Sequence, residues 1–326
     1  MSQPILTEEA LEPQAPAGEG IAARSSWELF RIRFMQDRAA VAGVVIIALL
    51  VVLALAAPLF RAIAGHGPND LFGNTMLTPD LGLPKGPNGK FWFGADQVGR
   101  DVFLRTIYGI RTSLVVAFVA TGLASFIGIV LGLTAGFRGG ALDTAISRLV
   151  DIVLSMPLLL FAIGISTVCS TTARGCLGGL LQPGLSLVTG IIALFTWPNI
   201  ARIVRGQVLS LREREFIEAA RSLGARNLWI MFRELLPNLV APIVVYTTLI
   251  IPSNILFEAA LSYLGVGVPQ STPSWGRMLS DATAGQLFTY AWWMMLFPGV
   301  FLVLTTLSFN LVGDGLRDAL GPSERG

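Results

Sequence analysis

The sequence EAARSLG at Glu218–Gly224, followed by Leu236-Pro237, lies between two long apolar stretches in a segment rich in arginine. A segment this polar cannot itself lie in lipid. Gly224 can end a first helix in the left-handed conformation, and Asn227 can cap a second helix. We therefore expect a helix-turn-helix between two membrane spans, presented to another protein at one membrane face. The alternative is a solvated loop whose charges only enforce topology.

The composition is that of an integral membrane protein. Hydrophobic residues make up 53% of the chain, charged residues only 13%, and the mean hydropathy is +0.67. A soluble domain carries about 25% charged residues. The formal net charge of +2 is too small to indicate a nucleic-acid partner, and the arginines cluster beside apolar stretches.

Six apolar stretches approach the roughly 20 residues that a helix needs to cross a hydrocarbon core of about 30 Å. They are Val41–Leu59, Ser113–Gly136, Leu149–Val168, Leu185–Ala201, Leu239–Leu261 and Ala291–Val312. The fourth is short, and prolines interrupt the last three. Because kinked helices need neighbours that satisfy the freed backbone groups, we predict an all-α polytopic membrane protein with six transmembrane helices in one bundle.

The remaining segments suggest a division of the chain. Residues 1–26 are rich in Glu, Pro, Gly and Ala and predict a disordered cytoplasmic tail. Residues 27–112 would hold a helix on the membrane surface, the first span as a retained anchor, and an extracytoplasmic segment. Residues 113–318 would form a core of five spans with a cytoplasmic loop at 202–238, and residues 319–326 a C-terminal tail.

The distribution of arginine predicts the orientation. With both termini inside the cell, the short cytoplasmic segments hold most of the arginines, and seven of them lie between Arg202 and Arg233. Cytoplasmic loops of membrane proteins carry such an excess of positive charge. The arginine-rich segment is therefore expected to face the cytosol.

The sequence contains no pattern for a phosphate-binding loop. If the protein's activity depends on ATP, the ATP would have to be hydrolysed by another chain. His66 is the only histidine and is expected to be a solvated loop residue, which leaves no Ser-His-Asp arrangement. We expect no enzyme activity and no bound cofactor. Cys169 and Cys176 with one distant histidine do not make a usual metal site. In the predicted topology both cysteines lie outside the membrane, where a disulfide and two free thiols are both possible.

Charged residues near the spans are candidates for function. Asp151, close to Arg148, is expected to be a structural partner at the cytoplasmic edge of the third span. Glu258 lies near the outer end of the fifth span, where a helix C-terminus disfavours a negative charge. A cation should offset it, either Arg277 or the amino group of a transported molecule on a translocation path or gate.

The segment Gly94–Arg105 precedes the second span. We expect a short helix there with Asp96 as its cap. Arg100 and Asp101 would then be surface charges at the membrane boundary.

The polar segment resembles the EAA loop of permease subunits of type I ABC importers. The residues that match are Glu218, Ala219, Ala220, Gly224, Leu236 and Pro237, whereas Glu234 stands where the family pattern has isoleucine. In that family the loop forms a coupling helix that inserts into a cleft on an ATPase subunit. The resemblance implies the type I ABC importer permease fold, and it implies a coupling role for the matching residues together with Arg221 and Leu223.

Three further stretches resemble the C-type permease subunit of dipeptide, oligopeptide and nickel importers. They are Gly94–Asp101 (GADQVGRD), Glu258–Gly267 (EAALSYLGVG) and Thr272–Gly276 (TPSWG). The resemblance implies a homologous B-type permease subunit, two cytoplasmic ABC ATPase subunits, an extracytoplasmic substrate-binding protein, membrane lipid and a peptide substrate as partners.

Three alternatives remain open. The importer could carry nickel or another small solute. The chain could instead be a secondary transporter, which should show inverted repeats that we do not find in the sequence. A membrane-anchored scaffold would give the broken helices and the polar loop no purpose.

Overall fold

The computed structural model describes residues 26–171, 176, 179 and 182–321. Of the two expected tails, residues 1–25 and 322–326 lie outside this part of the chain, whereas Ser26 begins α1 and Leu320 ends α13. The described residues are almost entirely helical. The helices are α1 (Ser26–Gln36), α2 (Arg38–Leu55), α3 (Ala57–Ala64), α4 (Gly73–Met76), α5 (Val102–Arg138), α6 (Gly140–Ser155), α7 (Leu158–Ser170), α8 (Leu185–Leu211), α9 (Glu215–Ser222), α10 (Asn227–Trp229), a π-helical turn (Ile230–Leu235), α11 (Leu236–Tyr263), α12 (Trp275–Thr283), a 3₁₀ turn (Ala284–Thr289) and α13 (Trp293–Leu320).

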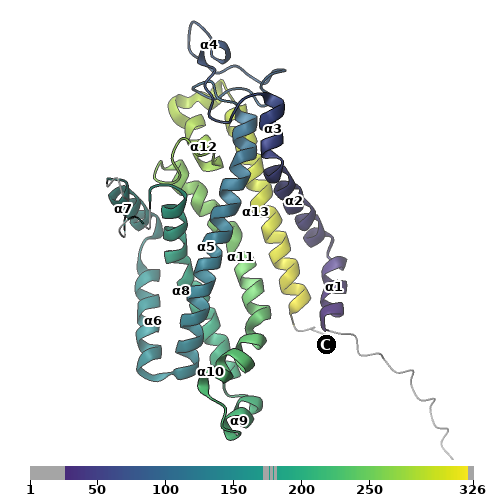
Figure 1. The fold of residues 1–326 in the computed structure, drawn as a ribbon, viewed down its shortest axis with the longest axis vertical. Coiled ribbons are helices and arrows are strands. Elements are labelled where there is room, and N and C mark those ends of the chain that lie inside the picture. The colour runs from purple at the N-terminus through teal and green to yellow at the C-terminus, as the bar shows by residue number, and fades with distance from the viewer. Residues whose placement is uncertain (1–25, 172–175, 177–178, 180–181, 322–326) are drawn as a thin grey trace, which may run out of the picture.

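Five of the described helices are long and apolar enough to cross a membrane, namely α2, α5, α8, α11 (continuous with the preceding turns) and α13, and α6 with α7 would make a sixth span. The fold is thus the predicted helical bundle (Figure 1). At one end α9 projects beyond the other helices, with α10 next to it, and at the opposite end α4 and its loops cover the bundle. We call the first end the arm end and the second the distal end. The C-terminal end of α13 lies toward the arm end.

The third span is not the single helix predicted for Leu149–Val168. Helices α6 and α7 are bent by 86° at a break of two residues. Pro157 lacks an N–H group and disfavours helical geometry at the residue before it, and Met156 is accordingly extended with ψ 131°. As a result α7 stands out from the side of the bundle (Figure 1).

The fourth span is also longer than predicted, because α8 continues through Pro198 as far as Leu211. Its closest neighbour is α5, and Gly128, Gly132 and Gly136 lie along the contact. A Cβ atom added to Gly132 would lie 2.5 Å from the carbonyl oxygen of Ala201. Only glycine permits this approach, as is common where membrane helices pack by close backbone contact. Helices α5 and α8 therefore form the tightly packed centre of the bundle.

Candidate functional sites at the arm end and the distal end

The arm, which we define as Arg212–Pro237, is anchored to the bundle by its inner face. Ile217 of α9 is fully buried and belongs to the same hydrophobic cluster as Phe137, at the end of α5. The Arg221 guanidinium lies 5.6 Å from the centre of the Phe137 ring, within the range of a cation–π contact. Arg212 Nη1 also donates a hydrogen bond of 3.0 Å to the carbonyl of Gly136. These contacts hold α9 against the end of α5.

The turn of the arm depends on Gly224. Its φ is +78°, a left-handed conformation that most residues other than glycine and asparagine adopt only with strain, and its N–H donates to the Arg221 carbonyl at 2.9 Å. The predicted cap of the second helix is wrong, because Asn227 is the first residue of α10 and Arg226 precedes it in extended conformation without a side-chain cap. The helix is instead continued by the π-helical turn into α11.

The outer face of the arm exposes both polar and apolar side chains. Glu218 and Ala219 are exposed, and Ala220 faces inward. Leu236 is half-buried, and Pro237 is exposed in the first turn of α11. Leu223 is 88% exposed. The sequence prediction missed three exposed apolar residues beside it, namely Leu228, Trp229 and Phe232.

Large apolar groups inside an arginine-rich segment were the available signal for these three residues. Polar and apolar side chains exposed together on one projecting segment are typical of a protein docking surface.

At the distal end, Glu258 is fully buried and hydrogen-bonded to three serines. The hydroxyls of Ser262 and Ser274 donate to Oε1 at 2.7 and 2.8 Å, and that of Ser113 donates to Oε2 at 3.0 Å. The expected cation is not among its contacts in the described residues, and Arg277 lies 3.5 Å from Asp281 instead. Glu258 therefore joins α5, α11 and the start of α12. We call these four residues the Glu258 cluster.

The charges of Gly94–Arg105 are buried, contrary to the predicted surface position. Arg100 lies between Asp96, at 2.6 Å, and Asp281 of α12, at 3.2 Å, and all three side chains are 6% exposed. Arg105 is fully buried and reaches Asn69 Oδ1 at 2.8 Å. Burial raises the pKa of Asp281 above the ordinary value of an aspartate and outweighs the neighbouring arginines, which lower it. This buried ion-pair network fixes the first of the three stretches to α12.

Asp101, and not Asp96, is the cap of the helix that follows. Its carboxylate accepts hydrogen bonds from the N–H groups of Phe103 and Leu104, the first turn of α5. Burial raises the pKa of Asp101 to about 6, while these hydrogen bonds and His66 lower it. His66 is also not the solvated residue that was expected. It is 8% exposed, and its Nε2 lies 3.7 Å from Asp101 Oδ2.

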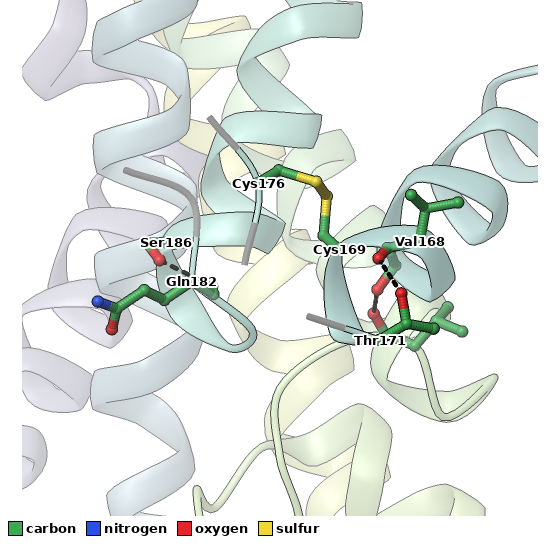
Figure 2. The surroundings of a disulfide bond; sticks show 8 residues. Val168, Cys169, Thr171, Cys176, Gln182 and Ser186 are labelled. Carbon is green, nitrogen blue, oxygen red and sulfur yellow. Dashed lines mark hydrogen bonds between the residues drawn. A yellow bond between two sulfur atoms is a disulfide. The ribbon is translucent and has the colours of Figure 1, made fainter. Parts of the chain in front are cut away.

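Cys169 of α7 and Cys176 form a disulfide, one of the two states that the sequence left open. Figure 2 shows the bridge beside the end of α7, where Thr171 donates to the carbonyl of Val168. Among the described residues no group of three or more His, Cys, Asp or Glu could hold a metal ion.

Asp151 does not sit at the start of a span beside Arg148. It lies far along α6, and its Oδ1 accepts a hydrogen bond of 3.0 Å from Arg202 of α8.

Comparison with known proteins identifies two matching family models. Residues 128–326 match the model described as binding-protein-dependent transport system inner membrane component. Residues 25–79 match the N-terminal TM domain of oligopeptide transport permease C.

Curated relatives align over nearly the whole chain. The oligopeptide transport system permease protein OppC of Bacillus subtilis is 38% identical over 301 residues, covering 92% of this chain and 91% of the relative. The dipeptide transport system permease protein DppC of Alkalihalophilus pseudofirmus is 39% identical over 321 residues, covering 98% and 97%. The di/tripeptide transport system permease protein DppC of Pseudomonas aeruginosa is 38% identical, covering 89% of each chain.

Among solved structures, a chain of the inward-facing MetNI methionine ABC transporter superposes with a TM-score of 0.53. The alignment covers 68% of this chain and 98% of that chain at 19% identity. The likeness concerns the fold, which is that of a type I ABC importer permease.

Proposed function

The chain belongs to the family of binding-protein-dependent transport system inner membrane components, and we propose that it is a transmembrane pore subunit of an ATP-driven importer of di- and oligopeptides. In this proposal it works with a homologous B-type permease, two cytoplasmic ATPases and an extracytoplasmic substrate-binding protein. The names of the curated relatives support peptides over nickel as the cargo.

The observation that carries the proposal is the arm. It projects from the bundle, exposes Leu223 and Trp229, and is fixed to α5 through Ile217 and Arg221. An ATPase that bound this surface could displace α9, and the displacement would pass to α5 and, through the continuous helix, to α11. Rigid elements of this kind carry domain motion from one site to another. We infer that the residues matching the EAA loop, Glu218 to Gly224 with Leu236 and Pro237, perform this coupling.

The proposed orientation places the arm end and both termini in the cytosol. The arginine-rich segment then lies inside the cell, as the positive-inside rule requires. In this orientation the third span runs from the cytosolic to the extracytoplasmic side. The disulfide between Cys169 and Cys176 follows this span and would lie outside the cytosol, where disulfides persist.

We place Glu258 in the outer gate as a positioning residue and not in the translocation path. Its carboxylate is enclosed by Ser113, Ser262 and Ser274, with no surface exposed. Glu258→Gln keeps the shape and can still pair with the three hydroxyls, so uptake should stay within about twofold of the unaltered protein, whereas Glu258→Leu should impair it. Loss of uptake with the glutamine variant would show that the charge itself acts on the cargo.

One experiment tests the proposed function as a whole. The chain is tagged at its C-terminus, purified gently from its native membrane, and its co-purifying proteins are identified by mass spectrometry. We expect a second permease and two ATPases, and the reconstituted complex should take up a dipeptide only with ATP and the loaded binding protein. Recovery of the chain with itself alone, or uptake that persists without ATP, would overturn the importer assignment.

A further inference from the structure

A pocket of about 300 Å³ opens on the side of the bundle between α5, α6 and α8. Its lining includes the small residues Gly132 and Ala201 and the polar residues Ser147, Asp151, Arg202 and Arg205. We call it the lateral pocket. Its volume is at the lower end of the range for small-molecule sites and suits a ligand of dipeptide size.

Two ion pairs lie at this side of the bundle, and they differ in strength. Arg205 is held by both oxygens of Asp143, with an Nη2–Oδ2 distance of 2.8 Å. Arg202 meets Asp151 through a single hydrogen bond, and both of these side chains are 57% exposed. An exposed pair of this kind is weak, because solvent screens it and two long side chains must be ordered. The Asp151–Arg202 pair can therefore open to a ligand at little cost.

The exposure of this pair is unexpected at its depth. Asp151 lies eight residues along α6 from Asp143, which is about 12 Å at the rise of an α-helix. Arg202 lies ten residues, or about 15 Å, before Arg212, which contacts the end of α5. Charged side chains within a membrane bundle do not face lipid but line water-filled cavities or pair with other charges. Asp151 and Arg202 pair with each other, but 57% of each side chain remains exposed, so we expect this side of α6 and α8 to face water rather than lipid.

We propose that the lateral pocket is a subsite on the translocation path that takes the main-chain ends of a peptide. The terminal ammonium group of the peptide binds Asp151 in place of Arg202, and its terminal carboxylate binds Arg202 in place of Asp151. A zwitterionic ligand carries both charges that are needed to pair with one exposed carboxylate and one exposed guanidinium at the same time. This inference rests on the proposed function and names the residues that handle its cargo.

The first test measures access to water. The chain has two cysteines, and these form the disulfide, so an introduced cysteine is its only free thiol. Asp151→Cys and Arg202→Cys are reconstituted with all partner subunits and treated with small charged methanethiosulfonates. Ile152→Cys is the matched control, because Ile152 is the next residue on α6, is 53% exposed and does not line the pocket.

We expect both pocket thiols to react at least tenfold faster than the control thiol. With Asp151→Cys the remaining Arg202 should favour the anionic reagent, and with Arg202→Cys the remaining Asp151 should favour the cationic one. Millimolar alanyl-alanine should slow both reactions. Labelling as slow as that of Ile152→Cys would overturn the proposal, because the face would then be dry. Labelling without charge preference or protection by the dipeptide would also overturn it.

The second test separates a path residue from a structural ion pair. Asp151→Asn and Arg202→Gln should each reduce dipeptide uptake about tenfold at saturating loaded binding protein. Arg148→Gln, at an exposed position of α6 that does not line the pocket, should not reduce uptake. The exchanged pair Asp151→Arg with Arg202→Asp should fail to restore uptake, because the charges then meet the wrong ends of the peptide.

Restored uptake in the exchanged pair would show a structural ion pair and would overturn the subsite. Failure of the proposed function looks different. In that case the unaltered complex takes up no dipeptide at all, while the thiol reactions still report whether the pocket is wet and charge-selective.

Discussion

Replacing Arg100 with methionine should destabilise the distal end far more than the same replacement at Arg202. Both arginines pair with an aspartate of another helix, and Arg100 also pairs with Asp96 of its own segment. The side chains of the Arg100 network are 6% exposed, whereas those of the Arg202 pair are 57% exposed. Methionine keeps the bulk of the side chain and removes the charge. The comparison therefore isolates the effect of burial on an ion pair.

The expected magnitude follows from the contacts that remain. Removing one partner of a buried ion pair costs about 3–5 kcal/mol, because the other charge is left uncompensated. Here Asp96 keeps Arg105 at 3.8 Å and Asp281 keeps Arg277 at 3.5 Å, so we expect the lower end of that range. The exposed pair is worth about 0–1 kcal/mol.

The assay is thermal unfolding of the purified assembled transporter, followed by tryptophan fluorescence. With about 2 °C per kcal/mol for a large chain, Arg100→Met should lower the midpoint by about 6 °C and Arg202→Met by about 2 °C or less. The deficit of Arg100→Met should shrink at lower pH, because burial already raises the pKa of Asp281 and its carboxyl can then take up a proton. A loss no larger than that of Arg202→Met would refute the view that the network stabilises the distal end.

Gly132→Ala should destabilise the α5–α8 contact by about 1–3 kcal/mol, because its Cβ would lie 2.5 Å from a carbonyl oxygen. Gly122→Ala on the same helix meets open space and should be neutral or stabilising. Equal midpoints of thermal unfolding for the two variants would contradict this. Gly224→Val forces a β-branched residue to a φ of +78° and should abolish ATP-coupled uptake without affecting membrane insertion, whereas Gly224→Asn, which tolerates this conformation, should retain uptake. Folding raises the pKa of Asp101 from 3.8 to about 6, so the folded state binds more protons between these values and stability falls as the pH rises through them. Asp101→Asn keeps the helix cap and should be more stable than the unaltered protein above pH 6, by up to about 3 kcal/mol. Its stability in thermal unfolding should depend less on pH between pH 4 and 6. An unchanged pH dependence would contradict a raised pKa of Asp101.

The spans could be predicted because each is a long apolar stretch, but their breaks could not. Met156-Pro157 interrupts no apolar run, so hydropathy placed one helix across it. The break depends on backbone geometry before a proline, which a hydropathy average does not contain. Conversely, α8 continues beyond its predicted end because Arg202 and Arg205 can remain helical while they face a polar pocket.

The charged residues at the distal end show that local sequence alone does not predict whether a charged side chain is buried. Arg100 was predicted to be a surface charge because its segment is polar and lies outside the spans. It is buried because Asp281 of α12, 181 residues further along the chain, completes the network with Asp96. For Glu258, Ser262 at i+4 was visible in the sequence, but Ser113 and Ser274 come from other elements. The sequence showed where the charges were, and the fold supplied their partners.

The two ends of the molecule handle charge in opposite ways, and this difference argues for a direction of transmission. At the distal end the carboxylates and guanidiniums are buried and paired, which holds α5, α11 and α12 together. At the arm end charges and apolar groups are exposed, which leaves them available to partners. Helix α11 connects the two ends, since it begins at Leu236 of the arm and carries Glu258 about 33 Å further along. In the coupling proposed above, a force applied at the arm would reach the Glu258 cluster through one continuous helix, and the distal end would move as a unit because its buried polar contacts join α5, α11 and α12.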